Sequence, residues 1–314
     1  MRESPPKPAS VASGGNTSPQ QAGIGRAALT VAAFTLTSIA LWAWAFEQRG
    51  RGAIHDYKFL LWGVLVLGLG VTSGGVFEFG LRQQVRIDAI PRAHSEDGPH
   101  VAWGPVVWLA VGISCAVALL ASGNFAIGQS AGTVRAVALT ILAIVGGTPA
   151  IVALLGIREV ILITGGREPW VDASRLHAYL ELRAMATGLL RGLGALVALT
   201  LFAAGAARQA LPPGAHGIEP PGVVIAFGVI GTTLVGVIYA VPGQALRREA
   251  RALMRLLAPP RGTEPAELRA ELDARENLER QLGLNASLFG DLQSAIVVAA
   301  PLIAASVTLF LPSR

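Results

Sequence analysis

The sequence contains a single cysteine, Cys115, and few charged residues. Charged side chains make up 14% of its 314 residues, against 52% hydrophobic side chains. One cysteine excludes a disulfide within the chain and a cysteine zinc site. So low a charge content excludes an ordinary soluble domain, in which about a quarter of the residues are charged. We therefore expect a membrane protein in which Cys115, inside an apolar run, is a packing residue.

Motifs for catalysis and for cofactor binding are also missing. The sequence has no phosphate loop, no nucleophile elbow, no HExxH motif and no carboxylate pair at helical spacing within an apolar run. The densest group of potential metal ligands follows no helix-based metal motif and surrounds a Gly-Pro turn, which favours a solvated loop: His94, Glu96, Asp97 and His100. We therefore predict a protein that is not an enzyme, with no catalytic residue, cofactor or metal. Catalytic groups that meet from distant loops leave no such motif in a sequence.

Long apolar runs are what the chain has in abundance. Seven of them approach the roughly 20 residues that a helix needs to cross the hydrocarbon core. The sequence therefore predicts an all-α, polytopic helical transmembrane bundle over residues 27–311. The expected spans are 27–46, 59–79, 101–121, 136–157, 185–207, 222–241 and 292–311. Residues 1–26 are rich in Pro, Ser, Gly and Gln, and we expect them to form a disordered cytoplasmic tail.

Local features of the spans predict how they pack. The first span ends in Ala43-Trp44-Ala45, which is compatible with cleavage, but its apolar run is long for a signal peptide, so an uncleaved anchor is favoured. Gly70 and Gly74 lie four residues apart in the second span, a spacing that lets another helix approach closely. Pro149 follows two glycines in the fourth span, where we expect a kink.

Basic residues predict how the chain is threaded. With the N-terminus inside, 18 Lys and Arg residues fall on inside segments and six on outside segments, and Arg191 lies within a span. The positive-inside rule then predicts a multi-pass protein of the cell inner (cytoplasmic) membrane, with a cytoplasmic N-terminus and an outside C-terminus. This threading accounts for the pI near 10.1 without nucleic acid, since the arginines are not interleaved with aromatics.

Two cytoplasmic segments have amphipathic patterns. Residues 171–184 alternate apolar and charged side chains, which predicts a helix that lies at the inner leaflet or leads straight into the fifth span. Residues 244–257 and 264–282 each carry leucines on a helical pattern, the first arm basic and the second acidic. Pro259, Pro260 and Gly262 separate them, so residues 244–283 are predicted to form an antiparallel, coiled-coil-like hairpin. The basic arm lying flat on anionic lipid is the alternative.

Charged residues inside or bordering the spans are the candidate functional residues, because charge within a bilayer is costly and often functional. They are Glu78, Arg191, Asp291, Arg158 and Glu159. All five are expected toward the inner side, and none at the membrane centre. Glu78 and Arg191 are expected to pair between helices. Snorkelling or structural pairing is favoured for the group over a polar vestibule for an ion or solute.

Two classes of function remain open. The favoured one is a non-enzymatic membrane scaffold or sensor that contacts a cytoplasmic protein partner through the 244–283 hairpin, with the lipid bilayer as its other partner. The alternative is a transporter or channel for a small solute or ion, which the glycine-rich and Pro-containing spans support. The absence of mid-membrane charge counts against transport.

Overall fold

The computed structural model describes residues 19–50, 55–92, 131–165, 172–210, 221–257 and 265–282, together with 104, 107 and 284. Its helices are α1 (Pro19–Arg49), α2 (Tyr57–Arg92), α4 (Ala131–Gly165), α5 (Asp172–Gln209), α6 (Pro221–Leu257) and α7 (Pro265–Leu282). Within these ranges no residue is in a strand. The predicted all-helical class is confirmed.

Four of the helices are long and apolar enough to cross a membrane. These stretches are Gly25–Arg49, Tyr57–Ile90, Val137–Ile163 and Ser174–Ala207, and they correspond to the first, second, fourth and fifth predicted spans. The sixth predicted span lies within α6, which is not among the four. The predicted spans 101–121 and 292–311 fall mostly or wholly outside the described residues, so the number seven is not confirmed. Of the predicted disordered tail 1–26, residues 19–26 are helical, because α1 already begins at Pro19, and the remainder lies outside the described residues.

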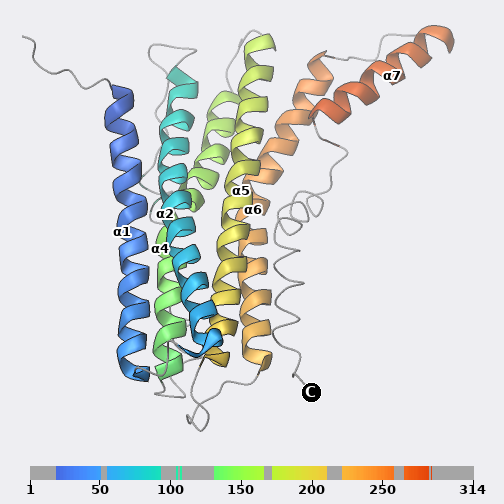
Figure 1. The fold of residues 1–314 in the computed structure, drawn as a ribbon. Helices are drawn as coiled ribbons and strands as arrows, with labels where there is room; N and C mark the ends of the chain where they lie inside the picture. Colours follow the sequence, from blue (N-terminus) through green and yellow to red (C-terminus); the bar gives the residue numbers. More distant parts are fainter. Residues whose placement is uncertain are drawn as a thin grey trace, which may run out of the picture.

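The long helices lie side by side in one bundle (Figure 1). α2 is central and packs against α1, α4 and α5, while α6 packs against α5 and α4. α1 lies at the edge and is mostly uncovered by protein, which suits a lipid-facing helix. The start of α1, the ends of α2, α4 and α6, and the start of α5 share one end of the bundle with α7. We call this end the α7 end.

Small residues allow α2 to approach its neighbours closely. A Cβ atom added at Gly74 would lie 2.7 Å from the Cα of Val31 in α1, and one added at Gly80 would lie 2.5 Å from the backbone N of Ala150 in α4. Neither position has room for a side chain. Such contacts let van der Waals packing hold helices together where the surrounding lipid is as apolar as the protein.

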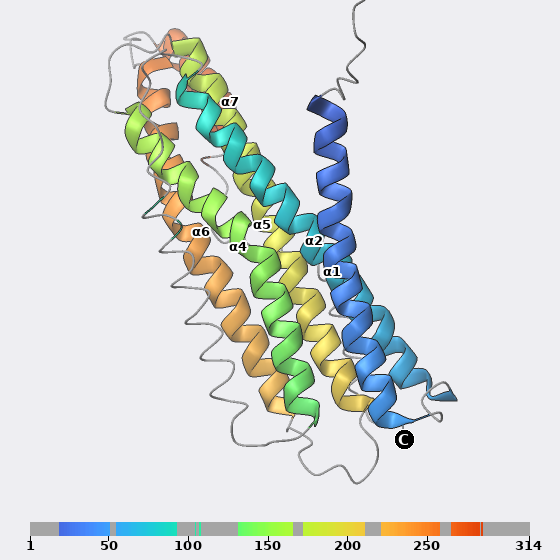
Figure 2. The same cartoon turned by 90° about the vertical axis from the view of Figure 1, so that its left-hand side faces the viewer.

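α5 is longer than a bilayer is thick. Its 38 residues extend over about 57 Å, while the hydrocarbon core measures about 30 Å. The described part of the predicted amphipathic segment, residues 172–184, is the first part of this continuous helix, so it leads straight into the fifth span. The prolines at 149 and 242 lie inside α4 and α6, and α4 changes direction along its length (Figure 2).

The predicted hairpin has both of its helices, but their antiparallel pairing is not confirmed. The apolar stripe of α6 is buried, with Leu246 4% and Leu253 0% exposed, yet α6 packs chiefly against α5 and α4 and touches α7 little. Leu272 of α7 is 56% exposed. α7 projects away from the bundle and meets it at its C-terminal end (Figure 1). A coiled-coil seam between these arms is likewise not confirmed.

Candidate functional site

The structure gives Glu78 a different partner from the one expected. Its carboxylate accepts a hydrogen bond from Arg82 Nε, one turn along α2, at 3.1 Å. Gly188 and Gly192 of α5 face the side chains of Phe79 and Val76 in α2. Arg191 therefore lies at a depth similar to that of Glu78. The side chain of Arg191 is exposed, however. α2 and α5 therefore meet at the predicted depth. Among the interactions of the described residues, however, there is no contact between Glu78 and Arg191.

The other three candidate residues form no common site with Glu78. Arg158 and Glu159 pair with each other, Nη1 to Oε1 at 2.7 Å, on a partly exposed face of α4. Neighbouring residues that pair at a surface add little stability. Asp291 lies outside the described residues. The four described candidate residues therefore pair locally or face outward, and the alternative, a polar vestibule, is not assembled in the part of the chain that the structure describes.

A different polar site lies at the α7 end, where α5, α6 and α7 meet; we call it the three-helix junction. Arg175 of α5 donates to Glu249 of α6 through two hydrogen bonds, Nε to Oε1 at 2.5 Å and Nη2 to Oε2 at 3.1 Å. Only 19% and 9% of the two side chains are exposed. A planar guanidinium that engages both carboxylate oxygens fixes direction as well as distance. This pair therefore sets how α6 lies against α5.

The same face of α5 holds the end of α7. The Tyr179 hydroxyl donates to the Leu282 carbonyl at 2.6 Å, and Arg183 Nη1 donates to the Gln281 carbonyl at 2.9 Å. The last carbonyls of a helix have no partner within the helix. α5 supplies those donors, and the Leu282 side chain is 1% exposed in the core. α7 is thus attached through its last turn.

The rest of α7 presents a charged surface. Of its described side chains, those at 269, 272–277, 280 and 281 are exposed. Arg280 pairs with Glu276 as the spacing predicts, at 2.5 Å, while Arg275 pairs with Glu279 at 3.7 Å. These charges satisfy one another within α7, so the exposed apolar side chain of Leu272 stands out on this surface.

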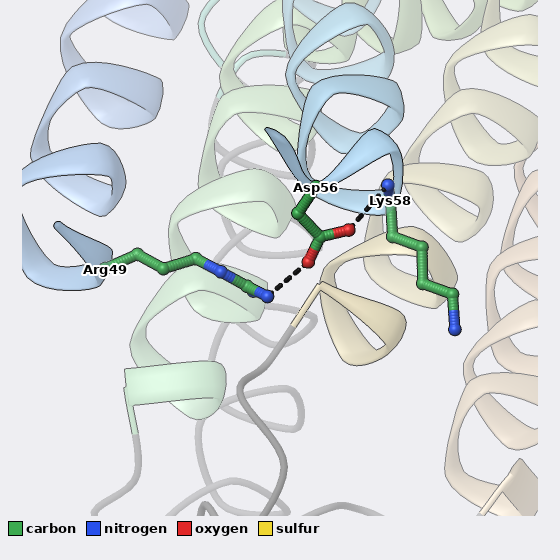
Figure 3. A network of polar contacts seen from close by, with 3 residues as sticks. All are labelled: Arg49, Asp56 and Lys58. Carbon is green, nitrogen blue, oxygen red and sulfur yellow. Dashed lines mark hydrogen bonds and ion pairs between the residues drawn. The ribbon is translucent and has the colours of Figure 1, made fainter. Parts of the chain in front are cut away.

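The opposite end of the bundle has its own polar contact between α1 and α2 (Figure 3). Arg49 at the end of α1 pairs with Asp56 in the short connection. The other carboxylate oxygen of Asp56 accepts from the backbone N–H of Lys58 at 2.9 Å. This is an N-cap on the first turn of α2. One acid thereby begins α2 and joins it to α1.

Sequence reasoning missed the three-helix junction. Arg175 and Tyr179 were recognised only as parts of an amphipathic pattern, and Glu249 as the single acid in a basic arm. That isolated acid, on the side of the helix that carries the apolar stripe, was the available signal. No family model, curated protein or solved structure matches the chain. Among the residues that the structure describes, no group of three His, Cys, Asp or Glu side chains is placed to hold a metal ion.

Proposed function

We propose that the protein is a non-enzymatic membrane scaffold or sensor that presents α7 to a cytoplasmic protein partner. The supporting observation is that α7 is attached at one end and exposed along most of its described length. Most helices owe their stability to packing of one face rather than to propensity. A helix that extends from the bundle gains that packing when a partner covers it.

The geometry of the three-helix junction suits this role. Because α7 is attached to α5, and α5 continues into a membrane span, a load or displacement on α7 reaches the bundle through the Tyr179 and Arg183 contacts. The basic residues that remain exposed at the end of α6 lie close by and add to the surface: Arg248, Arg251 and Arg255. The predicted hairpin becomes, in this proposal, an attached arm rather than a closed pair.

Affinity capture from detergent-solubilised native membranes tests the proposal. The wild-type chain is compared with Leu272→Glu, which places a charge on the exposed apolar position of α7, and with Ala274→Glu as the matched control. Residues two apart lie about 200° apart around a helix, so the control alters the opposite face. We expect a partner that is retained by wild type and Ala274→Glu and lost with Leu272→Glu. Identical recovery with all three chains would contradict the proposal.

A transporter is the second candidate, and one observation favours it. Ser73, Glu78 and Gln83 of α2 are buried, and each has a side-chain oxygen without a hydrogen-bond partner among the described residues. Buried polar groups without partners are costly unless water or a solute satisfies them. Ion flux into proteoliposomes that carry wild type or Glu78→Gln tests this function. A flux that the substitution abolishes supports transport, and equal leakage with empty liposomes refutes it.

A further inference from the structure

Arg135, in the first turns of α4, is buried in a way that an arginine rarely is. Only 3% of the residue is exposed. Its Nη2 donates to the Ala45 carbonyl of α1 over 3.5 Å, a long hydrogen bond. Its Nε and Nη1 are buried with no partner among the described residues. Charged side chains are almost never fully buried unless something pairs with them.

Aromatic rings of α1 and α2 enclose this arginine. The guanidinium carbon of Arg135 lies 5.2 Å from the centre of the Trp62 ring. Trp62 packs against Phe59 at 5.5 Å, and Phe59 stacks on Trp42 at 6.1 Å. A cation over an aromatic face is partly compensated for its lost hydration. The ring contact leaves the N–H donors unsatisfied, since they lie in the guanidinium plane.

A second cation lies in the same cluster. The guanidinium carbon of Arg49 is 5.6 Å from the centre of the Phe59 ring. Its Nη2 pairs with Asp56, and its Nη1 is buried without a partner among the described residues. Asp56 is thus an acid that pairs with the cluster, and Glu47 of α1 is exposed. Burial, and secondarily the charge of Arg49, lowers the pKa of the Arg135 guanidinium from its usual value.

Two further facts point to a ligand rather than to a purely structural cation. The Trp62 indole Nε1 is also buried without a partner, so a neutral donor accompanies the two guanidiniums. All of these groups donate, and the cluster has more positive than negative charge. An anion with several acceptor oxygens would give these donors their partners and balance the charge of the cluster. Arginine favours phosphate and carboxylate because its parallel N–H groups match two oxygens at once.

We propose that Arg135, Arg49 and Trp62 form a binding site for a phosphate-type oxyanion at the end of the bundle opposite α7. The anion is either the headgroup phosphate of an anionic phospholipid or free phosphate. Arg135 immediately precedes the apolar stretch Val137–Ile163, so the site lies at the depth where a lipid headgroup meets the hydrocarbon core. Binding balances the excess positive charge of the cluster and gives the buried donors their acceptors.

Thermal unfolding of the delipidated, purified full-length chain in nonionic detergent tests the site. One arm titrates inorganic phosphate against chloride at matched ionic strength. The other arm titrates mixed micelles that contain phosphatidylglycerol against micelles that contain phosphatidylcholine. Wild type is compared with Arg135→Gln and with Arg158→Gln, which removes an arginine from the same helix where 46% of the side chain is exposed. A ligand that binds only the folded state raises Tm.

We expect a saturable rise in Tm for wild type and for Arg158→Gln. For Arg135→Gln the half-saturating ligand concentration should be about tenfold or more higher, because a hydrogen bond between charged groups is lost. A response to phosphatidylglycerol alone assigns a lipid headgroup, and a response to inorganic phosphate assigns a free anion. Should Arg135→Gln not fold, Arg135→Lys keeps the charge without the paired N–H groups and is expected to weaken the same response. No response of wild type in either arm, or an equal response of the Arg135 variant, overturns the site.

Discussion

Glu249→Gln should destabilise the protein far more than a charge-neutralising change elsewhere at the α7 end. The substitution keeps the size of the side chain and removes its charge, so Arg175 stays between α5 and α6 without the carboxylate of Glu249. Only 9% of the Glu249 side chain and 19% of the Arg175 side chain are exposed, so water compensates little. Breaking a buried ion pair by removing one partner typically costs about 3–5 kcal/mol. Because Arg175 keeps some contact with water, we expect about 3 kcal/mol.

A double-mutant cycle isolates the pair from other effects. Glu249→Gln, Arg175→Gln and the double variant are unfolded with increasing sodium dodecyl sulfate in mixed micelles, and the free energies of unfolding are compared. Coupled contacts show interaction energies of about 0.5–3 kcal/mol, and two hydrogen bonds between charged groups favour the upper part of this range.

The matched control is the exposed pair Glu276–Arg280 of α7, whose side chains are 56% and 63% exposed. Surface pairs are worth about 0–1 kcal/mol, so Glu276→Gln should change the free energy of unfolding little. Strict additivity in the Arg175–Glu249 cycle, or a cost of Glu249→Gln no larger than that of Glu276→Gln, would refute the reasoning.

Three further outcomes are expected. Tyr179→Phe removes the hydrogen bond to the Leu282 carbonyl in the last turn of α7, so we expect a loss of about 1 kcal/mol and faster hydrogen exchange in α7. Unchanged exchange there would contradict the attachment. In a thermal-unfolding comparison, Gly80→Ala should destabilise the chain, because the added Cβ atom has no room beside α4. The matched control Gly75→Ala, with open space around it, should be neutral or stabilising by up to about 1 kcal/mol. Topology reporters fused at Gly262 and after Arg314 should read inside and outside, and two inside readings would mean that one span is miscounted.

The helical class and the close packing of helices could be predicted because each depends on a local property. Apolar length selects membrane helices whatever their neighbours are. The paired glycines at 70 and 74 mark a face that another helix can approach, and a Cβ at Gly70 would meet the Ser38 side chain at 2.1 Å. The pattern of 171–184 likewise predicted a helix. Whether that helix would lie on the leaflet or continue into the fifth span depends on its packing against α6. No local sequence pattern reports such a neighbour.

The hairpin shows how a count of leucines can mislead. Successive residues of a helix are about 100° apart, so Leu278 and Leu282 share one face, while Leu272 lies about 120° away from Leu278 around α7. One stripe of leucines would have allowed α6 to cover the whole of α7. The bundle instead buries Leu282, which is 1% exposed, packs the partly buried Leu278 against its core and leaves Leu272 outside. The angular position of each leucine was present in the sequence, and it predicts an arm attached at one end better than it predicts a closed hairpin.

Polar groups are harder to place because their environment, rather than their type, decides their role. In the sequence, Arg135 is one more basic residue beside a span, and in a topology argument it counts only toward the outside charge. In the folded chain it is 3% exposed, over the Trp62 ring, and it donates to the carbonyl of a residue 90 positions earlier. An arginine that snorkels and an arginine that is enclosed have the same sequence context. They differ in how many donors remain unsatisfied once the helices are packed, and for Arg135 those donors are the reason to expect an anion.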